Sequence, residues 1–165
     1  MPMRDALLPE FDAETASTRR LLERFPDGQA AWKPHPKSMS LGRLASHIAE
    51  IPGYTLAILQ SLEFDIEGGR TPQSLESRDA ILALFDEQVA RAREPLSRIE
   101  DSEMMVEWTF RKGSHIIMRV PRASALRILV LSHMIHHRGQ LTVYLRLHDI
   151  PLPATYGTSA DEGGA

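Results

Sequence analysis

The chain has 165 residues, a formal net charge of −3 and no cysteine. Lysine and arginine are scattered, so the charge gives no long-range attraction to nucleic acid, and no apolar run approaches the roughly 20 residues of a membrane-spanning helix. Without cysteine there are no disulfides or thiolate ligands, so any bound metal must be held by nitrogen and oxygen. The length favours one domain over residues 1–165, and the opening residues have no apolar signal segment, which indicates a cytoplasmic protein.

A first helix is expected to begin near Pro9 and to end at residues 26–28, because proline is tolerated close to a helix start and apolar residues then recur at helical spacing. Residues 31–40 contain prolines that exclude a regular helix or a paired strand. This segment is therefore expected to be a loop over the helices with Trp32 tucked in. His35, between two prolines, is predicted to be exposed and not a metal ligand.

Ser40 is a suitable N-cap for a second helix that runs to about Phe64. His47 lies on its apolar face, where a single histidine is more often a core residue with a hydrogen-bond partner than a metal ligand. Pro52 removes a backbone hydrogen bond just over one turn later, so the helix is predicted to kink there and to make room for a pocket. Glu50 is expected to face solvent; the alternatives are a hydrogen bond to a ligand histidine or a role as a base.

Residues 65–72 are expected to form a mobile connection, after which Ser74 or Ser77 caps a third helix. From residue 105 to residue 120 the hydrophobic period changes from the helical value to two, which is typical of strands. Gly113 permits a turn in the middle of this segment. The pattern therefore predicts a short β-hairpin inserted before the last helix.

A fourth helix is predicted over about residues 122–147. Its apolar stripe recurs at steps of three and four residues, at Leu126, Val130, His133, His137, Leu141, Tyr144 and His148. The stripe places His133 and His137 toward the interior, one turn apart and within reach of one ion, and it leaves His136 at the flank. Two imidazoles on a buried face need partners, so they are either metal ligands, the interpretation we favour, or core histidines with hydrogen bonds. If they are ligands, His47 is the candidate for the third.

The fourth helix is also apolar on almost every side between Leu126 and Ile135. Such a helix must be covered on every side, here by the hairpin, by the proline- and glycine-rich tail or by a second subunit. A two-fold contact covers the same patch on both subunits. We therefore expect a homodimer with Ile128 and Ile135, on the side away from the histidines, in the interface.

Four segments carry a combination that is specific in this order: WKPHPKSMS (32–40), LASHIA (44–49), HMIHHRGQL (133–141) and YGTSADE (156–162). Together they resemble the DinB-like proteins of the DinB/YfiT superfamily. The resemblance implies an all-α four-helix bundle with up-up-down-down connectivity, often dimeric, to which this chain adds the short hairpin before the last helix. It also implies that a divalent metal ion, nickel, zinc or iron, is held by His47, His133 and His137.

The superfamily contains thiol-dependent S-transferases and isomerases that use low-molecular-weight thiols, and many members have no established activity. The resemblance thus implies a metal-dependent enzyme acting on a small molecule, of the S-transferase or hydrolase type; the alternative is a non-catalytic dimeric module stiffened by the metal. Zinc proteases place a glutamate base directly after the first histidine, whereas Met134 stands there in this chain. Arg138 and Gln140 either orient His137 or an anionic substrate, or are polar residues of the helix surface or of an interface.

Overall fold

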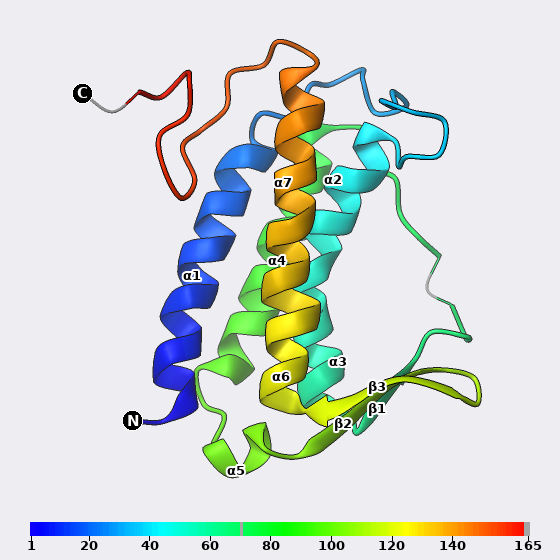
Figure 1. The fold of residues 1–165 in the computed structure, drawn as a ribbon, viewed down its shortest axis with the longest axis vertical. Helices are drawn as coiled ribbons and strands as arrows, with labels where there is room; N and C mark the ends of the chain where they lie inside the picture. Colours follow the sequence, from blue (N-terminus) through cyan, green and yellow to red (C-terminus); the bar gives the residue numbers. More distant parts are fainter. Residues whose placement is uncertain (70, 164–165) are drawn as a thin grey trace.

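The computed structural model describes residues 1–69 and 71–163. Helices make up most of it, and the strands form one small sheet (Figure 1). In chain order the elements are α1 (Met3–Leu22), α2 (Leu41–Glu50), the 3-10 turn η1 (Ile51–Gly53), α3 (Tyr54–Gln60), β1 (Glu63–Asp65), α4 (Arg78–Leu96), α5 (Asp101–Met104), β2 (Glu107–Lys112), β3 (His115–Pro121), α6 (Arg122–Leu126), the π-helical segment η2 (Arg127–Ser132) and α7 (His133–Arg146). Residue 70, in the connection expected at 65–72, and residues 164–165, at the end of the expected domain, lie outside the described residues.

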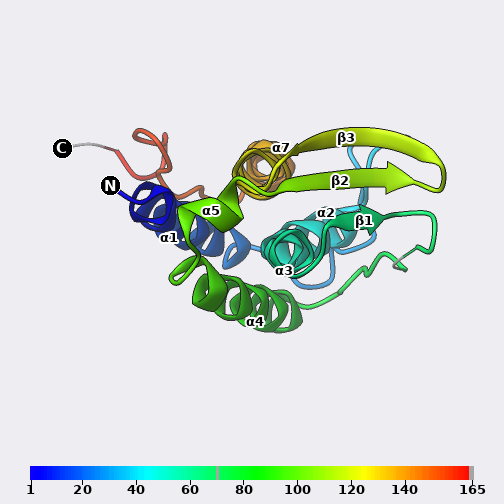
Figure 2. The same cartoon turned by 90° about the horizontal axis from the view of Figure 1, so that it is seen from below.

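Four helical columns stand side by side in the described part of the chain, namely α1, α2–η1–α3, α4 and α6–η2–α7. Seen from below, these columns surround a common centre, and the sheet projects to one side (Figure 2). Both α1 and α2 pack against α4 and α7. Each column contributes buried apolar side chains to the centre, among them Phe11, Ile48, Phe85 and Leu141. Removing these groups from water is the main driving force for packing the columns together.

The first helix begins earlier than predicted, because α1 starts at Met3 and Pro9 lies inside it. Pro9 cannot donate a hydrogen bond to the carbonyl of Asp5, but both residues are exposed, so water can satisfy that carbonyl. A distant contact also holds the first turn, since the amide of Met3 donates to Oδ1 of Asp101 at 2.8 Å. The helix start is thus stabilised by a tertiary contact that local sequence propensity does not contain.

Two of the predicted serine caps are present. Oγ of Ser40 accepts a hydrogen bond from the amide of Arg43 at 3.2 Å, and Oγ of Ser77 accepts one from the amide of Ala80 at 3.3 Å. Each bond satisfies an amide that has no partner inside its helix. The caps fix where α2 and α4 begin.

The α-helix is interrupted at Pro52 by the 3-10 turn η1, and the second helix ends at Gln60 and not near Phe64. Residues 63–65 instead form β1, which pairs in parallel with β2 and places Phe64 opposite Phe110. The sheet has the order β1-β2-β3. A strand of three residues shows no recognisable alternation, and its partner is distant in the sequence, so sequence periodicity missed it.

The predicted hairpin is confirmed, since β2 and β3 pair antiparallel. Gly113 has φ +56, a left-handed conformation that favours glycine at the turn between the two strands. The amide of Gly113 also donates to Oδ1 of Asp65 at 3.0 Å, which ties the turn to β1. The short helix α5 was not predicted; a capping box between Glu100 and Glu103 starts it.

The last column is continuous from α6 to α7, as predicted, although its middle part η2 is π-helical. Leu131 and Met134 are buried by other parts of the same chain. Much of the apolar surface of this helical column is therefore covered without a second subunit. Ile128 remains 46% exposed. Among the described residues, none of the helices, this column included, combines the length and the apolar character needed to cross a bilayer.

Candidate metal centre

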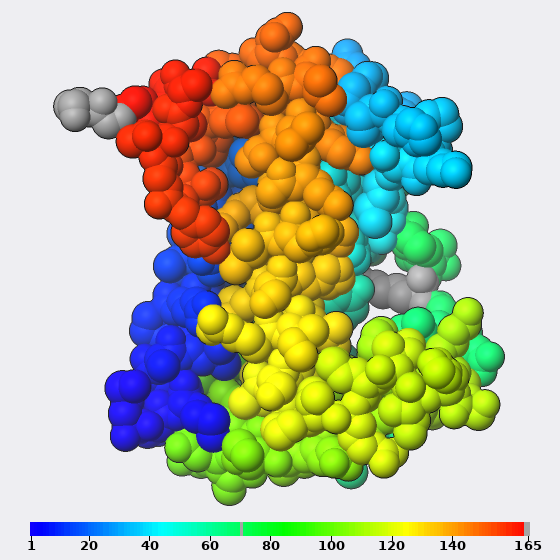
Figure 3. All heavy atoms as spheres, viewed as in Figure 1, coloured from blue at the N-terminus to red at the C-terminus, as the bar shows by residue number. Residues whose placement is uncertain are grey.

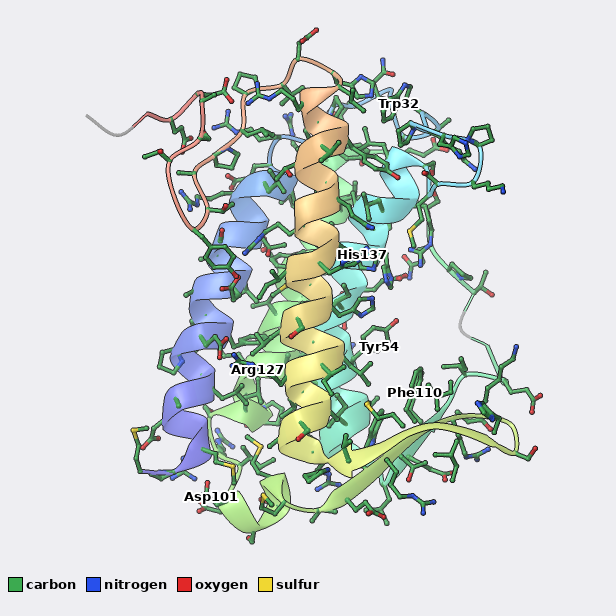
Figure 4. The ribbon with its side chains drawn as sticks, viewed as in Figure 1. Trp32, Tyr54, Asp101, Phe110, Arg127 and His137 are labelled. Atoms are coloured by element: carbon green, nitrogen blue, oxygen red, sulfur yellow. The ribbon has the colours of Figure 1, made fainter. Side chains whose placement is uncertain are left out.

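Two helical columns bring three histidines together. His47 lies in the last turn of α2, whereas His133 and His137 lie one turn apart at the start of α7. Nε2 of His133 is 3.2 Å from Nε2 of His47 and 3.0 Å from Nε2 of His137. In Figure 4, His137 lies on the side of α7 that faces α2. The predicted convergence of these three side chains is therefore present; metal binding itself stays a prediction.

The donor atoms fit a divalent metal ion. Zinc binds imidazole nitrogen at about 2.0–2.1 Å in a tetrahedron, which separates neighbouring nitrogens by about 3.4 Å. The separations of 3.0 and 3.2 Å in the cluster are close to this value. A neutral imidazole carries one N–H, so Nε2 atoms that face one another cannot all satisfy each other by hydrogen bonds. A cation among them would satisfy every lone pair.

The surroundings of His133 and His137 favour the neutral form of their imidazoles. Burial, with smaller contributions from the neighbouring rings of His137 and His47, lowers the pKa of His133 to about 4. Burial also lowers the pKa of His137, although the hydrogen bond to Gln140 acts in the opposite direction. The neutral imidazole is the form that ligates metal, so the electrostatics agree with the geometry.

Gln140 orients the ring of His137, which was one of the predicted alternatives for this residue. Its Oε1 is 2.7 Å from Nδ1 of His137. Because a carbonyl oxygen only accepts hydrogen bonds, Nδ1 carries the proton and the lone pair of Nε2 points into the cluster. Metal-ligating histidines usually have such an acceptor on their second nitrogen.

The expectation that Glu50 faces solvent was wrong. Glu50 is only 4% exposed, and its Oε2 lies 3.9 Å from Nδ1 of His47 and 3.3 Å from Nη1 of Arg43. Its Oε1 also accepts a hydrogen bond from the amide of Gln73 at 3.4 Å. The buried carboxylate of Glu50 is tolerated because the guanidinium of Arg43 and the amide of Gln73 compensate the loss of its hydration.

Sequence inspection missed Arg43, whose Nη2 lies 3.5 Å from Nδ1 of His47. Arg43, His47 and Glu50 are spaced by four and three residues on one stretch of helix and turn. That spacing places all three on one face, and it is the signal that was available in the sequence.

Arg138 does not belong to the histidine cluster. It is only 2% exposed, which excludes the second of its two predicted alternatives, a polar residue of the helix surface or of an interface. Its Nη1 lies 2.8 Å from Oε2 of Glu14 on α1, and its guanidinium lies 5.0 Å from the ring centroid of Tyr156 in the tail. Tyr156 donates a hydrogen bond to the other oxygen of Glu14 at 2.7 Å. Figure 3 shows the tail, in red, lying over the α1 side of the molecule.

Three other histidines are not part of the cluster. His136 is exposed at the flank of α7, and His35 is exposed in its loop, both as predicted. His148 packs against Trp32, with ring centroids 4.4 Å apart. Trp32 is half-buried there, which confirms the expected position of the loop.

The fold and the site together define a mainly helical protein with a small sheet and a cluster of three histidines between two of its helical columns. The chain matches the DinB family over residues 1–163, and it therefore belongs to that family.

Similar proteins of known sequence or structure agree with this assignment. The uncharacterized protein YrdA of Bacillus subtilis (strain 168) is 24% identical over an alignment of 163 residues, and the match covers 96% of this chain and 90% of YrdA. A DinB-like protein from Bacillus cereus ATCC 10987 superimposes with a TM-score of 0.73 at 22% identity, covering 94% of this chain and 98% of its own. The DinB-like protein YjoA from Bacillus subtilis gives a TM-score of 0.70 at 19% identity, covering 91% of this chain and 96% of its own. The two solved structures share the fold of this chain.

Proposed function

We propose that this protein binds one divalent metal ion, nickel, zinc or iron, through His47, His133 and His137, and that it is a metal-dependent enzyme acting on a small molecule. The convergence of the three Nε2 atoms, with ligand atoms within 4.8 Å of one another, carries the proposal. In the same proposal, the four helical columns are a four-helix bundle. Their order is up-down-down-up and not the expected up-up-down-down, because α1 and α6–η2–α7 run in one direction and α2–η1–α3 and α4 run in the other (Figure 1).

A divalent ion held by three imidazoles would supply a Lewis acid with an open position, which lowers the pKa of a water or a thiol that reaches it. The chain contributes the orientation of the ligands, because Gln140 holds the ring of His137 while Arg43 and Glu50 flank the ring of His47. The carboxylate of Glu50 lies 3.9 Å from Nδ1 of His47, and in this proposal it accepts a proton from the nucleophile.

Two reaction types remain within this proposal. In an S-transferase the nucleophile is a thiol, and since the chain has no cysteine, a low-molecular-weight thiol must bring it. In a hydrolase the nucleophile is water, and Glu50, which the sequence offered as a possible base, would accept its proton. The buried position of Glu50 therefore keeps both types open.

A second candidate is a non-catalytic, dimeric module in which the ion only stiffens the fold. The specific observation in its favour is that the ligands lie on separate columns, so an ion among them joins α2 to α7. Turnover separates the two candidates. Metal-loaded protein should convert some member of a panel of thiols and electrophiles or hydrolysable esters and amides, and metal-free protein should not.

Metal content tests the shared part of the proposal. Purified protein should contain about one divalent ion per chain by elemental analysis, and His47→Ala, His133→Ala and His137→Ala should each lose it. His136→Ala is the matched control, because this exposed histidine is adjacent to a ligand in sequence and lies outside the cluster. Full metal content in His137→Ala, or loss in His136→Ala, would show that the ligand set is wrong.

A further inference from the structure

A cavity of about 140 Å³ lies between α3, the sheet and the last helical column. Its walls include Tyr54, Ala57, Phe64, Trp108, Phe110 and His133. Two of them, Tyr54 and Phe110, are labelled in Figure 4, below His137 and on the same side of α7. The cavity thus lies beside the histidine cluster and not on the opposite face of the protein.

The wall of the cavity is aromatic and apolar. Successive ring centroids are 6.3 Å apart for Tyr54 and Phe64, 6.1 Å for Phe64 and Phe110, and 6.2 Å for Phe110 and Trp108. The indole nitrogen of Trp108 already donates to the carbonyl of Ala57 at 3.3 Å. No Asp, Glu, Lys or Arg is among the described residues that line the cavity. A charged group placed there would lose its hydration without a compensating partner.

One imidazole belongs both to the cavity wall and to the cluster. The ring of His133 stacks on that of Tyr54 with centroids 6.3 Å apart, and its Nε2 lies 3.0 Å from Nε2 of His137. A group that fills the cavity therefore contacts a member of the cluster directly. Atoms bonded to that group therefore lie close to the histidine cluster.

The volume limits what the cavity can hold. Apolar cavities of roughly 150 Å³ in proteins bind benzene. A cavity of about 140 Å³ therefore fits one six-membered ring, and a fused bicyclic group exceeds it. Ala57 and Phe110, on opposite elements α3 and β2, limit the size of the group from two sides.

We infer that the substrate of this protein carries a small, uncharged apolar group of single-ring size, which this cavity holds while the reacting atom lies at the histidine cluster. The inference rests on the proposed function only for the identity of the reacting centre. The rest of the substrate has polar surface available next to the cavity, because an adjoining cleft shares Tyr54, Ala57 and Phe64 with it and also includes Arg43 and Glu50.

Binding of a simple probe tests the inference without any knowledge of the reaction. Benzyl alcohol is titrated into metal-free, full-length Trp32→Phe protein, so that Trp108 in the cavity wall is the fluorescent reporter. Saturable binding is expected, with at least tenfold weaker binding in Ala57→Phe, where the new ring occupies the cavity. Ala83→Phe, the same substitution at an exposed position of α4, is the matched control and should bind like its parent. Phe110→Ala should improve binding of 2-naphthalenemethanol relative to benzyl alcohol.

A zinc titration of the same proteins separates this inference from the proposed function. Ala57→Phe should bind zinc like its parent, which also shows that the variant is folded. Zinc binding without saturable binding of benzyl alcohol would overturn the inference and leave the metal site standing. Equal affinity for benzyl alcohol in Ala57→Phe and its parent would overturn it too. Saturable binding of benzyl alcohol to a parent protein that binds no zinc would support the cavity and overturn the proposed metal site.

Discussion

Arg138 and Glu14 form a buried ion pair that joins the ligand helix α7 to α1. Nη1 of Arg138 lies 2.8 Å from Oε2 of Glu14, and the two side chains are 3% and 10% exposed. Arg138 directly follows the candidate ligand His137. The pair therefore fixes the position of α7 on the side opposite to the cluster, and it is the ion pair whose loss should affect stability most clearly.

Arg138→Met should lower the free energy of unfolding by about 3–5 kcal/mol, because it leaves a buried carboxylate without its cation. The double variant with Glu14→Gln should be destabilised by less than the sum of the single variants, since it removes both charges. Urea unfolding of the metal-free proteins measures these changes. Arg91→Met, which breaks an exposed pair with Glu87, should stay within about 0.5 kcal/mol. A similar loss in Arg91→Met and Arg138→Met would contradict the importance of burial.

Gln140→Leu should weaken zinc binding by about 10- to 100-fold, because it removes the acceptor that holds Nδ1 of His137. Gln140→Glu keeps an acceptor at the same position and should retain binding close to the wild type. Competition with a chelating dye measures the affinities. Gln60→Leu, at an exposed end of α3, serves as the control. Unchanged affinity in Gln140→Leu would mean that this hydrogen bond does not position the ring.

The metal-free protein should lose stability as the pH falls from about 6.5 to about 4. Burial keeps the pKa of His133 at about 4 in the folded chain, whereas an unfolded histidine titrates near 6.5. Between these values the unfolded chain binds more protons, so the contribution of His133 is fully present above pH 6.5 and is lost toward pH 4. The lowered pKa of His137 acts in the same direction.

Urea midpoints at several pH values measure this dependence. His133→Asn removes the titrating group, so its midpoint should fall less between pH 6.5 and 4 than that of the wild type. Parallel curves for the two proteins would rule out His133 as a source of the acid sensitivity.

The protein should be a homodimer in which the last helical column contributes to the interface. Ile128 is 46% exposed, although its neighbours Leu131 and Met134 are buried within the chain. Sedimentation should give about twice the chain mass of 18.5 kDa, and Ile128→Glu with Ile135→Glu should shift it toward the monomer. Val143→Glu, at another exposed position of α7, should remain dimeric. A wild type that is monomeric at micromolar concentration would reject the proposal.

Hydrophobic periodicity predicted which side chains of a single helix face the interior. The phase of the apolar stripe separated His133 and His137 from His136, because neighbouring residues on a helix differ by a fixed rotation. The second helix placed His47 on its inner face in the same way. The meeting of His47 with the other two was inferred from the need for a third ligand and from the resemblance, since two separate periodic patterns do not specify how their helices pack.

Features that depend on tertiary contacts were missed. The burial of Glu50 follows from Arg43 and from the chain near Gln73 closing over it, whereas a glutamate considered alone is expected at the surface. The inward position of Arg138 depends in the same way on Glu14 of a distant helix. The strand β1 forms through its parallel pairing with β2. Gln73, Glu14 and β2 are distant in the sequence from the groups that they stabilise, whereas Arg43 is seven residues from Glu50 and was available from helical spacing.

The separation of the candidate ligands along the chain has a practical consequence for identifying the metal. His47 and His133 are 86 residues apart, so their side chains come together only in the folded protein. An ion that needs both binds the native state and not the unfolded chain. It therefore raises the free energy of unfolding with the logarithm of its concentration over its dissociation constant, and the melting temperature rises with it. At 1,000 times the dissociation constant the gain is about 4 kcal/mol. Thermal shifts measured with nickel, zinc and iron would therefore rank the metals before any substrate is known.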